Sequence, residues 1–302
     1  MLRIRMKPAP ILIYVLFLTF AASLAVNAQQ SDLATDITFF CTDWGRDVPW
    51  DEYCKRVRDA GFDGIETWAP TDIAAQEEML NAFKKYNLAY IFLCTGSGAD
   101  FNTFLATYKQ RLEHAVALHP VSINSHTGKD HFDATQNEAL INLADSISRA
   151  SGVPIAHETH RGRFSFAAHI TQEYLERLPH LRLTLDISHW CNVHESMLDD
   201  QPEAVSLALQ RTDHIHARIG HPEGPQVNDP RAPEWESVVQ RHLEWWDAIV
   251  AAHGEQRKPL TITTEFGPPN YLPTLPYTRQ PVANQWDLNK YMLDLLKTRY
   301  EN

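Results

Sequence analysis

Cysteine, basic residues and long apolar segments are all scarce in this 302-residue sequence. Four cysteines are too few for a disulfide framework in a chain of this length, so we expect buried thiols at Cys41, Cys54, Cys94 and Cys191. Asp and Glu outnumber Lys and Arg by 38 to 27, and the net charge of −11 disfavours binding to nucleic acids and anionic lipids. The content of 44% hydrophobic and 22% charged residues is that of a globular protein, which excludes a disordered chain and a coiled coil.

The long apolar segment that is present lies at the N-terminus and has the pattern of a secretory signal peptide. Three basic residues precede an apolar run from Ile11 to Val26, and small residues surround a predicted cleavage site after Ala28. An uncleaved membrane anchor is the alternative, although the run is slightly shorter than a bilayer requires. Cleavage of residues 1–28 would leave residues 29–302 as a periplasmic or secreted protein without a membrane segment. It would also lower the net charge from −11 to −14, because it removes three basic residues and no acidic residue.

The predicted mature chain alternates short apolar runs with amphipathic segments eight times. Apolar positions recur at helical spacing within 101–112, 140–147 and 288–296, and Gly61 and Gly152 mark two helix ends. The predicted strands are 37–41, 64–67, 89–94, 121–124, 154–158, 182–186, 214–218 and 260–265.

Eight βα units predict a parallel sheet in a single α/β domain. Without a Gly-rich dinucleotide-binding turn, this pattern favours closure into a (β/α)8 TIM barrel over an open doubly wound sheet. Two long irregular segments, 219–233 and 267–281, each follow a predicted strand. In a barrel both would lie over the C-terminal face, which is where TIM barrels hold their active sites.

Four of the later strands end in residue types that bind metal ions: Glu158, Asp186, His216 and Glu265. The spacing from Glu158 to Asp186 is 28 residues and from Asp186 to His216 is 30, close to one βα step of roughly 30 residues. The longer interval before Glu265 contains the irregular segment 219–233. One acid alone would be interpreted as a solvated strand end, but four residues in register favour a metal site.

The chemistry of these four side chains favours particular metals. Three carboxylates and one imidazole suit Mn²⁺, and Mg²⁺, Co²⁺ and Zn²⁺ also fit. Because the set contains no thiolate, a structural zinc site is disfavoured.

Several segments of the chain resemble the xylose-isomerase-like TIM-barrel superfamily, also called the sugar phosphate isomerase/epimerase family. The resemblance covers most of the mature chain, and its most specific element is the Asp-x-x-His of Asp186 and His189. The segments that carry it are GIETW (64–68), HETHR (157–161), LDISH (185–189), HIHAR (214–218) and TEFG (264–267).

The resemblance implies the ligand set and its chemistry. Ketose 3-epimerases of this superfamily hold one divalent metal with Glu, Asp, His and Glu, which implies Glu158, Asp186, His216 and Glu265 as ligands here, with His214 as a weaker alternative to His216. Glu158 and Glu265 would also exchange protons with opposite faces of the sugar, through an enediolate that the metal stabilises. The resemblance further implies that His189 hydrogen-bonds a substrate oxygen.

Other residues near strand ends are candidates for substrate binding. Glu66 ends the second strand and could orient a histidine or bind a hydroxyl group, whereas Arg218 could bind substrate oxygens or form a surface salt bridge. His126 ends the fourth strand as a candidate acid or base, and His160 faces the same side as Glu158. Three tryptophans follow strand ends and could stack on sugars or pack in the core: Trp44, Trp68 and Trp190.

The segment after His216 departs from the epimerase pattern, and export argues against a phosphorylated sugar. We therefore expect a metal-dependent isomerase or epimerase that acts on a free or oxidised carbohydrate. A lyase or hydratase on 3-keto sugars or glycosides is the alternative, with an acid from His221 or Glu223, and a non-catalytic sugar-binding protein is a third. A DNA repair nuclease is disfavoured by the acidic charge, and a homo-oligomer is compatible with the sequence.

Overall fold

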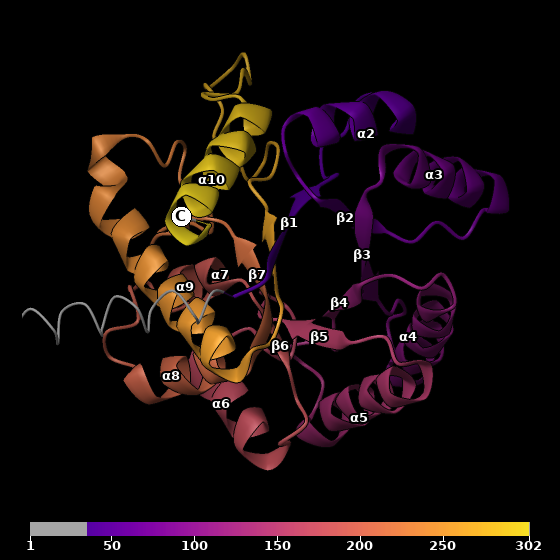
Figure 1. The fold of residues 1–302 in the computed structure, drawn as a ribbon. Coiled ribbons are helices and arrows are strands. Elements are labelled where there is room, and N and C mark those ends of the chain that lie inside the picture. Colours follow the sequence, from indigo (N-terminus) through magenta and orange to yellow (C-terminus); the bar gives the residue numbers. More distant parts are fainter. Residues whose placement is uncertain (1–34, 302) are drawn as a thin grey trace, which may run out of the picture.

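The computed structural model describes residues 35–301, which form a closed barrel of parallel strands (Figure 1). Neighbouring strands pair in chain order, and the pairing of β8 with β1 closes the barrel. The predicted (β/α)8 barrel is therefore confirmed, and an open doubly wound sheet is excluded. The strands are β1 (Ile37–Thr42), β2 (Gly64–Trp68), β3 (Ala89–Thr95), β4 (Ser122–His126), β5 (Ile155–Glu158), β6 (Leu183–Leu185), β7 (Thr212–Ala217) and β8 (Leu260–Thr264).

Helices surround the strands on the outside of the barrel (Figure 1). The three predicted helical patterns coincide with α4, α5 and α10, whose buried faces include Phe104, Leu140 and Met292. The helices are α2 (Trp50–Asp59), α3 (Ile73–Tyr86), α4 (Phe101–Val116), α5 (Ala134–Ser151), α6 (Ala168–Arg177), α7 (Ile187–Val193), α8 (Pro202–Gln210), η1 (Pro233–Trp235), α9 (Glu236–Gln256) and α10 (Gln285–Tyr300).

Alternation along the strands decides which side chains enter the barrel. On β1, Phe39 and Cys41 pack in the hydrophobic cluster outside the barrel, so Phe40 between them points to the opposite side. Gly64 on β2 makes room for Phe40, because a Cβ atom there would lie 2.4 Å from the phenylalanine ring. The same alternation turns polar residues of the later strands inward, and these residues build the site described below.

Several sequence expectations are settled by these residues. All four cysteines are free and buried, and α5 ends at Gly152 with a φ of 74°, as expected for a helix end. Among residues 35–301, no helix is both long enough and apolar enough to cross a membrane. The predicted signal peptide, residues 1–28, lies outside the described residues.

Most predicted strand boundaries were wrong by one or two residues, and two of them show why. The fourth strand extends to His126 instead of ending at residue 124. The sixth stops at Leu185, because the side chain of Asp186 accepts a hydrogen bond from the Ser188 amide and so caps the N-terminus of α7.

Candidate active site

A cavity of about 380 Å³ opens at the C-terminal ends of the strands. Its walls combine acidic, basic and aromatic side chains, as a site for a small polar molecule requires. The lining residues are Thr42, Asp43, Trp44, Trp68, Leu93, His126, Glu158, His160, Arg218, Glu265 and Tyr271.

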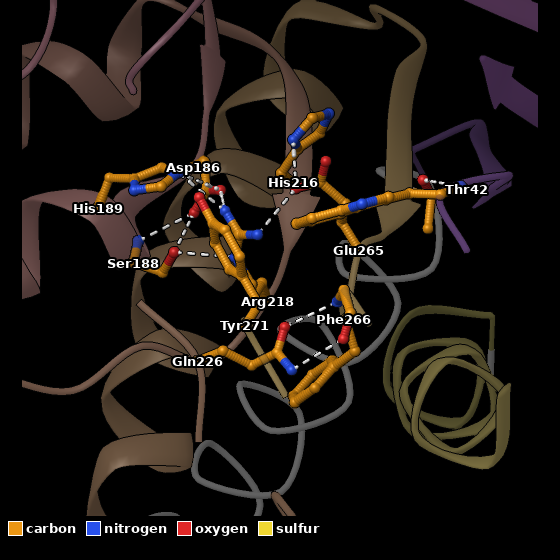
Figure 2. Close-up of polar contacts among 12 residues, drawn as sticks. Thr42, Asp186, Ser188, His189, His216, Arg218, Gln226, Glu265, Phe266 and Tyr271 are labelled. Atoms are coloured by element: carbon orange, nitrogen blue, oxygen red, sulfur yellow. Dashed lines mark hydrogen bonds and ion pairs between the residues drawn. The ribbon is translucent and has the colours of Figure 1, made fainter. Parts of the chain in front are cut away.

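The four residues predicted as metal ligands lie together beneath this cavity. Ligand atoms of Glu158, Asp186 and His216 are all within 4.8 Å of one another, and all three residues are buried. Glu265 completes the group, because its Oε2 lies 2.9 Å from Nδ1 of His216 (Figure 2). Four consecutive strands and their ends thus bring three carboxylates and one imidazole to one point.

The hydrogen-bond network determines which nitrogen of His216 carries hydrogen. The amide nitrogen of Asn124 donates to Glu66 at 3.0 Å and to Glu158 at 2.7 Å, which uses both of its hydrogens. His216 Nε2 lies 3.1 Å from both oxygens of Glu66, so we assign the hydrogen to Nε2, which donates to that carboxylate. Glu66 therefore orients His216, one of its two predicted roles, and leaves Nδ1 free to bind a cation.

The free nitrogen of His216 faces negative charge. Nδ1 lies 2.9 Å from Oε2 of Glu265 and 3.8 Å from Oε2 of Glu158. Both Nδ1 and Oε2 of Glu265 are buried without a hydrogen-bond partner among the described residues. A lone pair and carboxylate oxygens at these distances repel one another unless a proton or a metal ion lies between them.

The surroundings shift the pKa of His216 and the pKa of Glu158 in opposite directions. Burial alone would lower the pKa of His216, but the carboxylates of Glu265, Glu66 and Glu158 outweigh it and raise that pKa well above its ordinary value. Burial would raise the pKa of Glu158, yet the nearby His126 and His216 hold it well below its usual range. This cluster therefore strongly favours a positive charge at the position that His216 Nδ1 faces.

The pKa of Asp186 is shifted in the direction opposite to that of Glu158. Burial raises its pKa to about 6, although the adjacent guanidinium of Arg218 opposes this shift. Arg218 forms a close ion pair with Oδ2 of Asp186, and its Nη1 lies 3.6 Å from Oε2 of Glu265 (Figure 2). The alternative of a surface salt bridge for Arg218 is thus excluded, because this side chain is only 1% exposed and lies inside the site.

Histidines and a tryptophan form one wall of the cavity. His126 Nε2 lies 2.6 Å from Oε2 of Glu158, and the His126 ring stacks on His160 with centroids 5.0 Å apart. The edge of Trp68 meets the same His126 ring at 5.5 Å, and 46% of Trp68 remains exposed at the rim. His126, His160 and Trp68 therefore all line the cavity.

His189, which the resemblance implies as a hydrogen-bond partner of a substrate oxygen, lies beside the cluster and between two arginines. It is fully buried and does not line the cavity. Arg161 donates to its Nδ1 at 3.0 Å, and Nη2 of Arg218 lies 3.0 Å from its Nε2. A substrate oxygen would reach His189 only after one of these arginines had moved.

The loops after β7 and β8 position the part of the cavity wall that contains Glu265 and Tyr271. The side chain of Gln226 accepts from the amide of Gly267 at 2.7 Å and donates to its carbonyl at 3.2 Å, next to Glu265 (Figure 2). The loop after β8 then places Tyr271 over Arg218, whose guanidinium carbon lies 4.8 Å from the tyrosine ring centre. The predicted position of both long loops over the C-terminal face agrees with these contacts.

Some site residues were missed by the sequence, and others were misplaced. Asn124 gave a weak signal, since it lies two residues before His126 and so faces the same side of β4. Tyr271 lies in a proline-rich loop that gives no periodic signal.

Three residues predicted near the site do not line the cavity. Trp190 is fully buried in α7, so it packs in the core and cannot stack on a sugar. His221 and Glu223 also do not line the cavity.

Comparison with known proteins gives a family and a fold. The family model named xylose isomerase-like TIM barrel matches residues 54–244. No curated protein matches the sequence. Among solved structures, a xylose isomerase-like TIM barrel protein from Mycobacterium smegmatis in complex with magnesium is similar at 13% identity and a TM-score of 0.58, covering 86% of this chain and 97% of that chain.

Two enzymes are similar to a comparable degree. D-allulose 3-epimerase from Methylomonas sp. matches with 17% identity and a TM-score of 0.56, over 88% of this chain and 98% of that chain. A probable 3-DHS dehydratase from Bacillus anthracis matches with 16% identity and a TM-score of 0.56, over 87% of this chain and 99% of that chain. At such identities the structures show a shared fold.

Proposed function

Because the chain belongs to the xylose isomerase-like TIM-barrel family, we propose that it is a metal-dependent enzyme that isomerises or epimerises a free or oxidised sugar. The proposal includes export to the periplasm or the medium after removal of residues 1–28, for which the N-terminal pattern is the support. The cavity supports this substrate class, because it combines acid and base groups with exposed aromatic rings.

One observation carries the metal dependence: Nδ1 of His216 lies 2.9 Å from Oε2 of Glu265, and neither atom has a hydrogen-bond partner among residues 35–301. Glu158 and Asp186 direct further carboxylate oxygens to the same position. A divalent ion fits this donor set, since oxygen ligands with one imidazole suit Mn²⁺ and also accommodate Mg²⁺, Co²⁺ or Zn²⁺. Glu158, Asp186, His216 and Glu265 would hold the ion.

The ion would supply Lewis-acid stabilisation of the negative charge that develops on substrate oxygens when a proton leaves the carbon beside a carbonyl group. The protein supplies the groups that move the proton. Glu158 on β5 and Glu265 after β8 both line the cavity, so one carboxylate takes a proton and the other returns one. His126 lies 2.6 Å from Glu158 and orients that carboxylate.

The cavity rim supports a carbohydrate as the substrate. Trp44 and Trp68 are 37% and 46% exposed, and both line the cavity together with Tyr271. Aromatic faces at a polar site suit the apolar faces of sugar rings. The net charge of −11 disfavours a nucleic acid as the substrate.

A metal-dependent lyase or hydratase on 3-keto sugars or glycosides is the second candidate. It uses the same proton abstraction and needs an additional acid for the leaving group. His126 favours this candidate, because it lines the cavity, whereas His221 and Glu223 do not.

Deuterium uptake tests the proposal. The purified protein is incubated with Mn²⁺ in D₂O against free ketoses, aldoses, uronic acids and 3-keto glucosides, with and without EDTA, and product masses are measured. We expect EDTA-sensitive incorporation of deuterium at one carbon with no loss of a leaving group. Loss of a leaving group would identify a lyase, and ligand-induced thermal stabilisation without incorporation would instead identify a sugar-binding protein.

A further inference from the structure

Arg218 occupies the place of a cation within the acidic cluster. Its Nη2 pairs closely with Oδ2 of Asp186, and its Nη1 lies 3.6 Å from Oε2 of Glu265 (Figure 2). Both carboxylates belong to the set that would hold a divalent ion. The guanidinium thus neutralises two proposed ligands in the structure described here.

The two oxygens of Asp186 are both engaged. Oδ1 accepts hydrogen bonds from the amide and the hydroxyl group of Ser188, whereas Oδ2 faces Arg218. An ion that bound Asp186 would therefore approach an oxygen that already contacts a guanidinium. A divalent ion and a guanidinium that contact the same buried carboxylate repel each other strongly. They cannot share Asp186 without a cost in free energy.

The other neighbours of Arg218 allow it to leave Asp186. Its Nε donates to the hydroxyl of Ser188 at 3.2 Å, and its Nη2 lies 3.0 Å from His189. The ring of Tyr271 covers it at 4.8 Å. Apart from Glu265, these neighbours are uncharged or aromatic, and Arg218 is among the residues that line the cavity.

We propose that Arg218 is a displaceable counter-ion of the metal centre. It compensates Asp186 and Glu265 when no divalent ion is bound, and ion binding moves the guanidinium from Asp186 toward the cavity. In the cavity the guanidinium contacts the substrate, so Arg218 reaches its substrate-binding position only when the divalent ion is bound. This inference rests on the proposed function, because it requires that the centre binds a divalent ion.

Calorimetric titration with Mn²⁺ tests this role. Arg218→Met removes the charge that competes with the ion, and we expect it to bind Mn²⁺ at least about tenfold more tightly than the wild type. Arg218→Lys keeps a positive charge but cannot contact Asp186 and Glu265 at the same time, so we expect a severalfold gain in Mn²⁺ affinity. Arg161→Met is the matched control, since Arg161 contacts His189 and Tyr271 but none of the proposed ligands, and its affinity should equal that of the wild type.

The sign of the change separates this role from simple support of the site. If Arg218 only held the ligands in place, both Arg218 variants would bind Mn²⁺ more weakly, and that result would overturn the proposal. Unchanged affinity in both variants would also overturn it. If Arg218→Met does not fold, Arg218→Lys alone decides, because an affinity equal to or below that of the wild type contradicts the proposal. Absence of Mn²⁺ binding in the wild type would instead refute the proposed function.

Thermal unfolding gives a second measurement that does not depend on activity. Without metal, Arg218→Met should unfold at a lower temperature than the wild type, because Asp186 then lacks its counter-charge in a buried site. Saturating Mn²⁺ should produce a larger upward shift in the variant than in the wild type. An equal or smaller shift would contradict displacement of Arg218 by the ion.

Discussion

The side-chain amide of Asn124 determines how its neighbours in the site are oriented. The amide of Asn124 has two hydrogens, and it donates one to Glu66 and the other to Glu158. His216 must then direct its own hydrogen to Glu66, which leaves the other ring nitrogen facing Glu265. One neutral amide therefore fixes two carboxylates and, through them, the orientation of an imidazole.

Replacing either proposed proton-transfer group should stop turnover without unfolding the protein. Glu158→Gln and Glu265→Gln keep the size of each side chain but remove its charge, so each variant loses a base and weakens ion binding. We expect turnover to fall by a factor of about 100 or more in each variant. Activity is measured with whichever sugar exchanges deuterium, and circular dichroism verifies the fold.

Glu176→Gln is the matched control for these variants. Glu176 is an exposed residue of α6 that accepts a hydrogen bond from Gln172, and its loss should leave turnover unchanged. Full activity in a protein that carries both Glu158→Gln and Glu265→Gln would refute their assignment to proton transfer.

Asn124 should control metal affinity although it is not one of the four proposed ligands. It acts through its contacts with Glu158 and His216. In Asn124→Ala, Glu66 and Glu158 lose a donor, so the ligands are less well oriented, and we expect Mn²⁺ to bind about 10 to 100 times more weakly. Asn137→Ala provides the comparison, because this buried asparagine instead holds the carbonyls of Lys129 and Phe132. It should lower stability and leave Mn²⁺ affinity unchanged; equal affinity losses in both variants would contradict the role of Asn124.

The sequence could predict the acids and the histidine of the site but not their mutual contacts. Glu158, Asp186, His216 and Glu265 give a signal because each stands at a strand end and the strands recur at a regular interval. Arg218 is a sequence candidate for substrate binding because it lies two residues after His216, but its pairing with Asp186 depends on how the end of β7 and the start of α7 meet in space. Such contacts between distant segments leave no local pattern.

At the level of elements, the loop that follows β7 begins between two helices. The amide of Gly220 donates to Nε2 of His242 on α9 at 3.2 Å, while a Cβ atom on Gly220 would lie 2.6 Å from Ser188 of α7. His242 also contacts the carbonyl of Val238 through Nδ1. Neutral His242 satisfies both contacts, because Nδ1 donates and Nε2 accepts.

This loop contact predicts a specific loss of stability in acid. Burial lowers the pKa of His242 from 6.5 to about 4, so the unfolded chain takes up a proton at a higher pH than the folded protein does. The stabilisation is present above about pH 6.5 and is lost progressively as the pH falls to about 4. Between pH 7 and pH 5 this one group should lower the free energy of unfolding by about 2 kcal/mol.

His242→Gln tests the contribution, since glutamine can accept from Gly220 but does not titrate. Urea unfolding at pH 7 and pH 5 should show a loss of stability that is about 2 kcal/mol greater in the wild type than in the variant. Other buried histidines, such as His157, contribute equally to both proteins and cancel in the comparison. The same loss in both proteins would show that His242 is not responsible.

Element boundaries show where sequence patterns stop being informative. All eight strands could be located from short apolar runs, because the strand residues that face the surrounding helices are mainly apolar. The end of β6 could not, because the side chain of Asp186 turns back to cap α7 and so ends the strand one residue early. Capping depends on a backbone turn that the apolar pattern does not record.

Across the whole molecule, the site joins strands that are distant in sequence. Glu66 comes from β2, Asn124 from β4 and His216 from β7, so the network spans the inside of the barrel. Four carboxylates meet there, and Arg218 pairs with two of them. Without a bound ion, the remaining negative charge is a source of instability in the folded protein.

Divalent ions should therefore stabilise the entire barrel. Binding to the folded state alone adds about 2.7 kcal/mol when the free ion is at 100 times its dissociation constant. For a domain of this size, that free energy should raise the melting temperature by roughly 5 to 10 °C. Differential scanning fluorimetry of the EDTA-treated protein, with and without added Mn²⁺, measures the shift.

The variant that carries both Glu158→Gln and Glu265→Gln serves as the control for this shift. It lacks two of the four proposed ligands, so Mn²⁺ should leave its melting temperature nearly unchanged. It should also melt higher than the metal-free wild type, because two of the buried negative charges that repel one another have been removed. An equal Mn²⁺ shift in wild type and variant would place the stabilising ion elsewhere on the protein.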